Sequence, residues 1–173
     1  MKVNGRHIGD DCSPYIIAEV SANHNGKIDK AKDCISAAKL AGAHAVKIQT
    51  YEPQTMTIDS SKDDFLVKSG LWKDYTLFDL YTEAQTPFEW HEELFKHAND
   101  IGITLFSTPF DETAVDLLES LETPAYKIAS FELTDLKLIE RVSLTKKPLF
   151  MSTGMATVDE INDAVQCAKA NGA

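Results

Sequence analysis

The sequence predicts an α/β fold: the N-terminal five βα units of a TIM (β/α)8 barrel, truncated before closure. Short apolar runs alternate with segments of helical periodicity, which is typical of βαβ units and a parallel sheet. Each apolar run also ends in charged or hydroxyl side chains. Barrels build their sites in this way, at the C-terminal ends of their strands.

Glycines that end helices and residues that cap them set the boundaries of the expected helices and strands. Gly42 and Gly102 end helices, and Asp111 can cap the start of another. Two segments have capping-box spacing: Thr86–Glu89, with proline at the first helical position, and Thr157–Glu160. We expect strands at 15–20, 45–50, 104–109, 125–129 and 148–153, and helices at 28–40, 76–84, 86–100, 112–121, 135–144 and 157–170.

Two segments do not follow this alternation of short strands and helices. Residues 1–14 form a polar N-terminal segment, or a small hairpin that turns at Asn4-Gly5. Residues 51–85 are too long for an ordinary connection, and their aromatic residues argue against disorder. We expect this stretch to fold over the barrel mouth, with its aromatic side chains packing the loop rather than forming a sugar platform.

Five βα units cannot close an eight-stranded barrel, and they would leave two parallel sheet edges open. We therefore expect residues 15–173 to be a partial barrel from a longer protein. A complete flavodoxin-like sheet is the alternative. It would concentrate its site at one switch point, whereas here every strand ends in polar residues.

The composition limits the classes of partner. A formal net charge of −10 and a pI of about 4.9 argue against nucleic acid and anionic membranes as partners. The three cysteines are scattered without CxxC spacing, which indicates reduced thiols in a cytoplasmic protein. No apolar run approaches transmembrane length.

Side-chain alternation predicts which polar residues meet. Glu19, Lys47, Thr108 and Ser152 each fall on a strand face that can point into the barrel, and they would converge at its mouth. Lys127 and Ser130 are three positions apart, so their side chains would point to opposite faces of a continuous strand. Both reach one site only if their strand ends near residue 129 and the chain bends there.

Lysines at strand ends are typical of two chemistries. A desolvated lysine can form a Schiff base, whereas two lysines with hydroxyls beside them can clamp a phosphate or carboxylate. The clamp is favoured, with Glu19 and Glu132 as candidate proton-transfer groups. For Glu19 the structural alternative is a buried ion pair with a lysine. A third possibility is a half-barrel that only binds a ligand or associates with itself.

The histidines show no metal-ligand spacing. We interpret His24 as a hydrogen-bonded structural residue of its loop. The other four are expected to face solvent: His7, His44, His91 and His97.

Five ordered motifs cover nearly the whole chain and resemble the sialic acid synthase family: IIAEVSANHNG (16–26), VKIQT (46–50), FSTPF (106–110), AYKIAS (125–130) and STGM (152–155). Four further segments are most similar to the pseudaminic acid synthases within that family: residues 21–23, 70–72, 75–81 and 131–132.

The resemblance implies a synthase that condenses phosphoenolpyruvate with an acetamido sugar and releases phosphate by C–O cleavage. For a pseudaminic acid synthase the sugar is a 2,4-diacetamido-2,4,6-trideoxy-altrose; an N-acetylneuraminate or legionaminate synthase is the close alternative. Glu19 and Glu132 would be catalytic, and Asn23 and Gln49 would lie on the sugar side. Phosphoenolpyruvate would be held by Lys47, Thr108, Lys127, Ser130 and Ser152.

The resemblance also implies a domain-swapped homodimer, in which an antifreeze-like domain follows a complete barrel. A divalent metal, Mn²⁺ or Mg²⁺, would orient the sugar aldehyde and a water. The family's metal ligands correspond to positions beyond Ala173, so no ligand is assigned here. We accordingly expect the 173-residue polypeptide to be inactive by itself.

Overall fold

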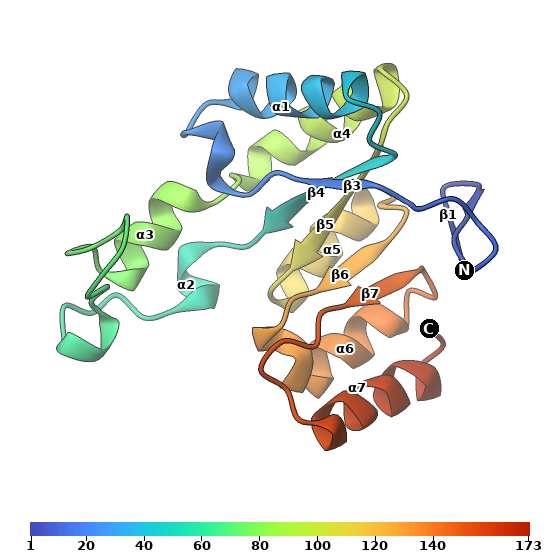
Figure 1. The fold of residues 1–173 in the computed structure, drawn as a ribbon. Helices are drawn as coiled ribbons and strands as arrows, with labels where there is room; N and C mark the ends of the chain where they lie inside the picture. Colours follow the sequence, from blue (N-terminus) through green and yellow to red (C-terminus); the bar gives the residue numbers. More distant parts are fainter.

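The computed structural model describes residues 1–173 and contains a curved, fully parallel five-stranded sheet (Figure 1). Each strand pairs with the next one along the chain, which is the order of a barrel. A flavodoxin-like sheet would exchange its first two strands, so that alternative is wrong. The strands are β3 (Ile17–Glu19), β4 (Ala45–Thr50), β5 (Thr104–Pro109), β6 (Tyr126–Ile128) and β7 (Leu149–Met151).

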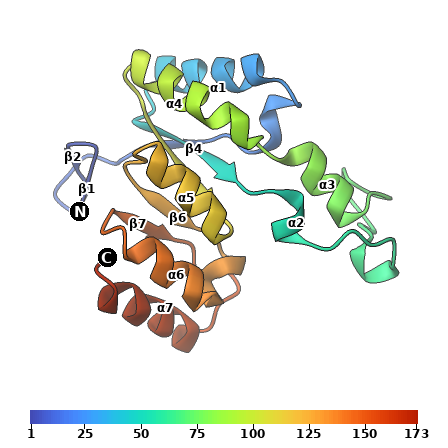
Figure 2. The same ribbon diagram turned by 180° about the vertical axis from the view of Figure 1, so that it is seen from behind.

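The main helices cover the convex face of the sheet, and the concave face is left free (Figure 2). Because a doubly wound sheet carries helices on both faces, this arrangement identifies a half-barrel. The predicted fold class is therefore confirmed. The covering helices are α1 (Ile28–Leu40), α4 (His91–Asp100), α5 (Glu112–Ser120), α6 (Leu136–Ser143) and α7 (Val158–Ala170).

Side-chain alternation separates the core from the site. Val46 and Ile48 of β4 are buried in a cluster with residues of α1 and α4. Tyr126 and Ile128 of β6 are buried in a second cluster with residues of α5, α6 and α7. The residues between them, Lys47 and Lys127, consequently point to the concave face.

An N-terminal hairpin covers the amino end of the strands. It pairs β1 (Lys2–Val3) with β2 (Arg6–His7). Asn4 and Gly5 have φ values of 43° and 85°, as the predicted tight turn requires. Val3 is buried with Ala45 of β4, and Asn4 Nδ2 donates to Thr104 Oγ1 at 3.1 Å.

Local hydrogen bonds shift two predicted boundaries. β3 starts at Ile17 rather than at residue 15, because the Ile16 N–H donates to His44 Nδ1 at 2.8 Å instead of joining a ladder. Thr86 forms no capping box. The chain tightens into the 3₁₀ helix η3 (Phe88–Trp90), and α4 begins only at His91.

The expected caps of two later helices do form. Asp111 accepts hydrogen bonds from the N–H groups of Thr113 and Ala114 at the start of α5. Thr157 and Glu160 make a reciprocal capping box at the start of α7. None of the helices combines the length and the apolar character that a bilayer crossing requires.

Residues 51–85, called the arm below, extend outward from the carboxyl end of β4 (Figures 1 and 2). The arm contains the expected helix, α3 (Leu77–Ala84). It also contains two short helices that the sequence did not predict, α2 (Pro53–Met56) and the 3₁₀ helix η2 (Asp63–Phe65). The arm stands beside the mouth of the half-barrel, so the expectation that it folds across the mouth is wrong.

The prediction that His91 faces solvent is also wrong, because its side chain is completely buried between α4 and the sheet. His91 Nδ1 lies 3.0 Å from the carbonyl oxygen of Pro87, and Nε2 lies 2.8 Å from Thr50 Oγ1. The carbonyl requires a proton on Nδ1, so Nε2 accepts from the threonine hydroxyl in the neutral ring. Thr50 in turn contacts Ser107 Oγ at 2.6 Å, which joins α4 to β4 and β5.

Burial predicts a pH dependence of stability. Desolvation lowers the pKa of His91 and of the buried His24 below the ordinary value of 6.5. Below pH 6.5 the unfolded chain therefore binds more protons than the folded chain. We expect the free energy of unfolding to be fully retained above pH 6.5 and to fall as pH decreases, by at most about 1.4 kcal/mol per pH unit for each histidine.

Urea unfolding followed between about pH 7 and pH 5 measures this dependence. The His91→Gln variant should show a shallower slope than the wild type. The exposed His7 provides a matched control, His7→Gln, which should leave the slope unchanged. Stability that rises on acidification through this range would contradict the assignment of a buried neutral His91.

Candidate active site

Lys47 lies at the centre of the concave face. Its strand, β4, runs between β3 and β5, and Lys47 pairs in register with Glu19. Lys47 Nζ is 2.8 Å from Glu19 Oε1 and donates to Thr108 Oγ1 at 3.1 Å. The lysine side chain is only 12% exposed, whereas that of Glu19 is 51% exposed. The ion pair considered above for Glu19 therefore forms, but its carboxylate is half exposed at the mouth.

Lys127 points to the same face from β6, but the register places it two residues further along the sheet than Lys47. Its Nζ donates to Ser152 Oγ at 2.6 Å and to the carbonyl oxygen of Ile128 at 2.8 Å. Desolvation lowers the pKa of Lys127, and the positive charge of Lys47 lowers it further. The charge of Lys47 thus acts on Lys127 across the concave face.

The chain bends before Ser130, at the point where Lys127 and Ser130 would need a bend to reach one site. β6 ends at Ile128, and Ser130 already has helical dihedral angles, with φ −65° and ψ −35°. A Cβ atom on Gly154 would lie 3.1 Å from Ser130 Oγ, so the glycine permits this close approach. We call Glu19, Lys47, Thr108, Lys127, Ser130 and Ser152 the strand-end cluster.

Glu132 follows in the 3₁₀ helix η4 (Phe131–Thr134). One of its oxygens, Oε2, is buried without a hydrogen-bond partner. This desolvation raises the pKa of the Glu132 carboxyl, while the charge of Lys127 acts in the opposite direction and lowers it. A carboxyl group with a raised pKa and an unpartnered oxygen suits proton transfer, so Glu132 remains a candidate for that role.

A cavity of about 1050 Å³ lies beside the cluster, between the strand-end loops and the arm. Asn23, Gln49 and Glu132 all line it, and the sugar-side role of Asn23 and Gln49 stays a prediction. Ser21 connects the first two, because its hydroxyl donates to Gln49 Oε1 at 2.6 Å and its N–H donates to Asn23 Oδ1 at 3.3 Å. The lysines do not line the cavity, so Glu132 stands between two compartments.

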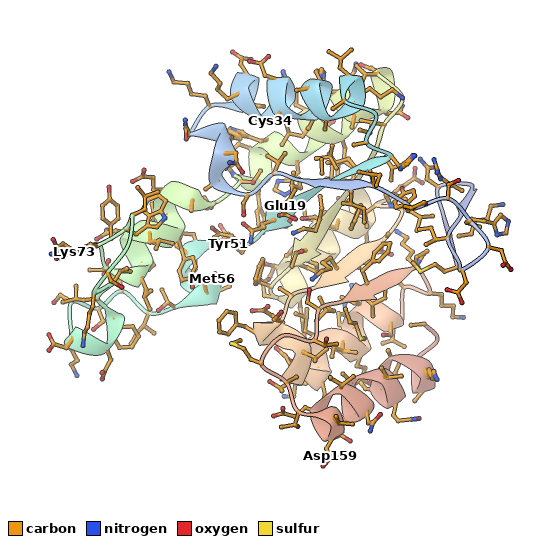
Figure 3. All side chains as sticks on the ribbon, viewed as in Figure 1. Glu19, Cys34, Tyr51, Met56, Lys73 and Asp159 are labelled. Atoms are coloured by element: carbon orange, nitrogen blue, oxygen red, sulfur yellow. The ribbon has the colours of Figure 1, made fainter.

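Aromatic residues that the sequence analysis assigned to packing, or did not single out, also form the walls of this cavity. Tyr51 contacts Tyr81 and Phe110 edge-on, with ring centroids 5.8 and 5.4 Å apart. In Figure 3, Tyr51 lies where the arm leaves the sheet. Tyr51 and Phe110 directly follow β4 and β5. That position after a strand was the signal that could have identified them.

His24 has the structural role expected of it. Its side chain is buried against Trp90, with ring centroids 5.4 Å apart, and its Nδ1 accepts from the Gly26 N–H at 3.1 Å. Residues 1–173 contain no group of three or more histidine, cysteine, aspartate or glutamate side chains that could hold a metal. The chain's own residues therefore do not fit the divalent metal that the resemblance implies.

Lys47→Met tests the coupling of the two lysines. It should raise the pKa of Lys127, because it removes a neighbouring positive charge and frees Glu19 to act on Lys127. A pH titration of the Lys127 ¹³Cε resonance measures this, with the exposed Lys73→Met of the arm as the control. An unchanged pKa of Lys127 would mean that the two ammonium groups do not share one site.

Comparisons with known proteins agree with the fold and with these motifs. A model of the NeuB family matches residues 34–173. The chain is 48% identical, over 159 residues, to the pseudaminic acid synthase of Helicobacter pylori, covering 91% of this chain and 47% of that protein. It is 34% identical, over 169 residues, to the N,N'-diacetyllegionaminic acid synthase of Legionella pneumophila, covering 97% of this chain and 48% of that protein.

Among solved structures, the N-acetylneuraminic acid (sialic acid) synthetase of Leptospira borgpetersenii superposes with a TM-score of 0.85 at 24% identity. The match covers 99% of this chain and 55% of that one, and it supports the fold. The chain spans about half the length of the curated relatives it matches. The resemblance to sialic acid synthases, and to the pseudaminic acid synthases among them, is thus confirmed, and the chain belongs to the NeuB family.

Proposed function

We propose that this chain carries the phosphoenolpyruvate site of a pseudaminic acid synthase. The enzyme would condense phosphoenolpyruvate with a 2,4-diacetamido-2,4,6-trideoxy-altrose to form a nonulosonic acid and release phosphate. One observation carries this proposal. Two lysine side chains, each hydrogen-bonded to a hydroxyl, point to the concave face from β4 and β6, and the charge of Lys47 lowers the pKa of Lys127.

Charge supports phosphoenolpyruvate as the ligand of the strand-end cluster. The molecule carries a phosphate and a carboxylate, and each anionic group can accept from an ammonium and from neighbouring hydroxyls. Without an anion, Lys47 and Lys127 repel each other and Lys127 is partly desolvated. An anion bound between them would offset both costs, and the hydroxyls of Thr108, Ser130 and Ser152 would fix its orientation.

The two carboxyl groups suit different roles. Glu132 lies between the cluster and the cavity, and its raised pKa suits a group that gives or takes a proton where the two substrates meet. Glu19 contacts Lys47 and remains half exposed at the mouth. We assign to it the stabilisation of positive charge that develops at the reacting carbon, as an oxocarbenium-like centre requires.

The rest of the proposed enzyme involves residues that this chain does not supply. A divalent metal, Mn²⁺ or Mg²⁺, would be held elsewhere in the complete protein, since residues 1–173 do not fit one. The complete protein is proposed to be a cytoplasmic homodimer. Release of phosphate by the 173-residue chain with phosphoenolpyruvate, the sugar and Mn²⁺ would contradict the expectation that it is inactive alone.

A Schiff-base aldolase is a second candidate, favoured by the lowered pKa of Lys127. Against it, Lys127 Nζ is engaged by Ser152 and by a carbonyl oxygen, and a second lysine stands beside it. Borohydride reduction in the presence of pyruvate separates the two chemistries. Stable labelling of Lys127 would support the aldolase, and no labelling would count against it.

Calorimetric titration with phosphoenolpyruvate tests the proposed site. Lys127→Met retains most of the side-chain volume but removes the charge, and we expect it to weaken binding by about ten-fold or more. Lys137→Met, on the exposed face of α6, is the matched control and should bind as the wild type does.

Equal affinity of wild type and Lys127→Met would contradict the proposed role of the cluster. A folded wild-type chain with no affinity for phosphoenolpyruvate would do the same, and would leave residues 1–173 as a scaffold. Sedimentation of that chain as a defined oligomer without ligand affinity would support the non-catalytic half-barrel.

A further inference from the structure

The cavity beside the strand-end cluster has two chemically different sides. Toward the strand ends it is lined by polar groups that include Ser21, Asn23 and Gln49. Toward the arm it is lined by aromatic and aliphatic groups, and 12 of its 18 lining residues are hydrophobic. A ligand that fills it must therefore present hydrogen-bonding groups on one side and apolar groups on the other.

The apolar side includes Leu71, Trp72 and Tyr75, which we call the arm wall. Their loop is fixed by backbone pairing: the Val67 N–H donates to the Tyr75 carbonyl at 2.9 Å, and the Asp74 N–H donates to the Val67 carbonyl at 3.0 Å. Trp72 and Tyr75 meet edge-on with ring centroids 5.3 Å apart. Contacts within the arm thus fix the Trp72–Tyr75 pair before any ligand arrives, whereas Leu71 is 92% exposed at the edge of the wall.

The charges of the cavity exclude one class of ligand. No lysine, arginine or histidine lines it, whereas two carboxyl groups do, Glu83 and Glu132. Tyr75 OH donates to Glu83 Oε2 at 3.0 Å, which places this exposed carboxylate next to the arm wall. A phosphorylated sugar would meet this carboxylate without a compensating cation, so the geometry favours an uncharged ligand.

We infer that the arm wall determines the specificity of the enzyme for its acceptor sugar. It takes the methyl-bearing substituents of an uncharged acetamido sugar, and Glu83 rejects sugars that carry a phosphate. The inference rests on the proposed function, and it adds the residues that would choose the sugar. Acetyl and deoxy methyl groups suit aromatic and leucine surfaces, while the sugar's hydroxyl and amide groups turn toward Asn23 and Gln49.

Two probes test this with the 173-residue chain: a 2,4-diacetamido-2,4,6-trideoxyhexose and a 2-acetamido-2-deoxyhexose 6-phosphate. Saturation-transfer NMR should place the acetamido methyl groups of the first probe against the protein, and the second should bind at least about ten-fold more weakly. Trp72→Ala should weaken binding of the first probe by about ten-fold. Trp72→Phe, which keeps an aromatic face, should weaken that binding less. Glu83→Gln should reduce the ratio of the two probes' affinities by about five-fold, because it removes the negative charge that repels the phosphate.

Phosphoenolpyruvate affinity is measured in parallel, because Trp72 and Glu83 lie outside the strand-end cluster and their variants should retain it. Equal binding of the two probes, no binding of the methyl-bearing probe, or an unaffected Trp72→Ala variant would overturn the inference. A chain that selects the uncharged sugar but does not bind phosphoenolpyruvate would contradict the proposed function and leave the inference about the arm wall standing.

Discussion

Two lysine side chains that point to the concave face of the sheet are the constraint on which the rest of this structure depends. Lys47 and Lys127 alternate with buried core residues along their strands, so the pleat fixes both charged side chains on the concave face. Their neighbours reduce the cost of that placement. Glu19 contacts one ammonium, and Ser152 and a backbone carbonyl accept from the other. The remaining repulsion and desolvation make the pair a site for an anion.

The mouth is divided by charge, and this division gives the two proposed substrates separate places. The strand-end cluster supplies cations and hydroxyls, whereas the neighbouring cavity contains no basic group. Glu132 borders both and keeps a buried, unpartnered oxygen. A proton carrier in that position serves a reaction in which an anionic molecule and an uncharged sugar meet at one carbon.

Much of the fold followed from the sequence because each strand carries a strong local signal. Alternation on β4 predicted the inward face of Lys47. A common site for Lys127 and Ser130 required the chain to bend near residue 129, and it does bend at the end of β6. Errors arose where tertiary contacts override local pattern. His91 looked like a surface residue of an exposed helix. Its burial depends on Thr50, forty-one positions earlier in the chain, which no local pattern reveals.

In the arm, too, tertiary contacts that the local sequence does not reveal decide how the side chains are placed. Aromatic residues between 65 and 81 could be packing residues or a ligand wall, and Trp72, Tyr75 and Tyr81 contribute to both. Their composition excluded disorder, but their orientation depends on backbone pairing between Val67 and Tyr75 and on the contact of Tyr81 with Tyr51. Periodicity gave no indication that the arm would stand beside the mouth.

The most direct test of the account is a crystal structure of this chain with phosphoenolpyruvate. We expect the ligand between β4 and β6, with its anionic groups within hydrogen-bond distance of both Lys47 Nζ and Lys127 Nζ and its reacting carbon toward Glu132. Phosphoenolpyruvate bound away from these lysines would contradict the account, as would a molecule that contacts only one of them.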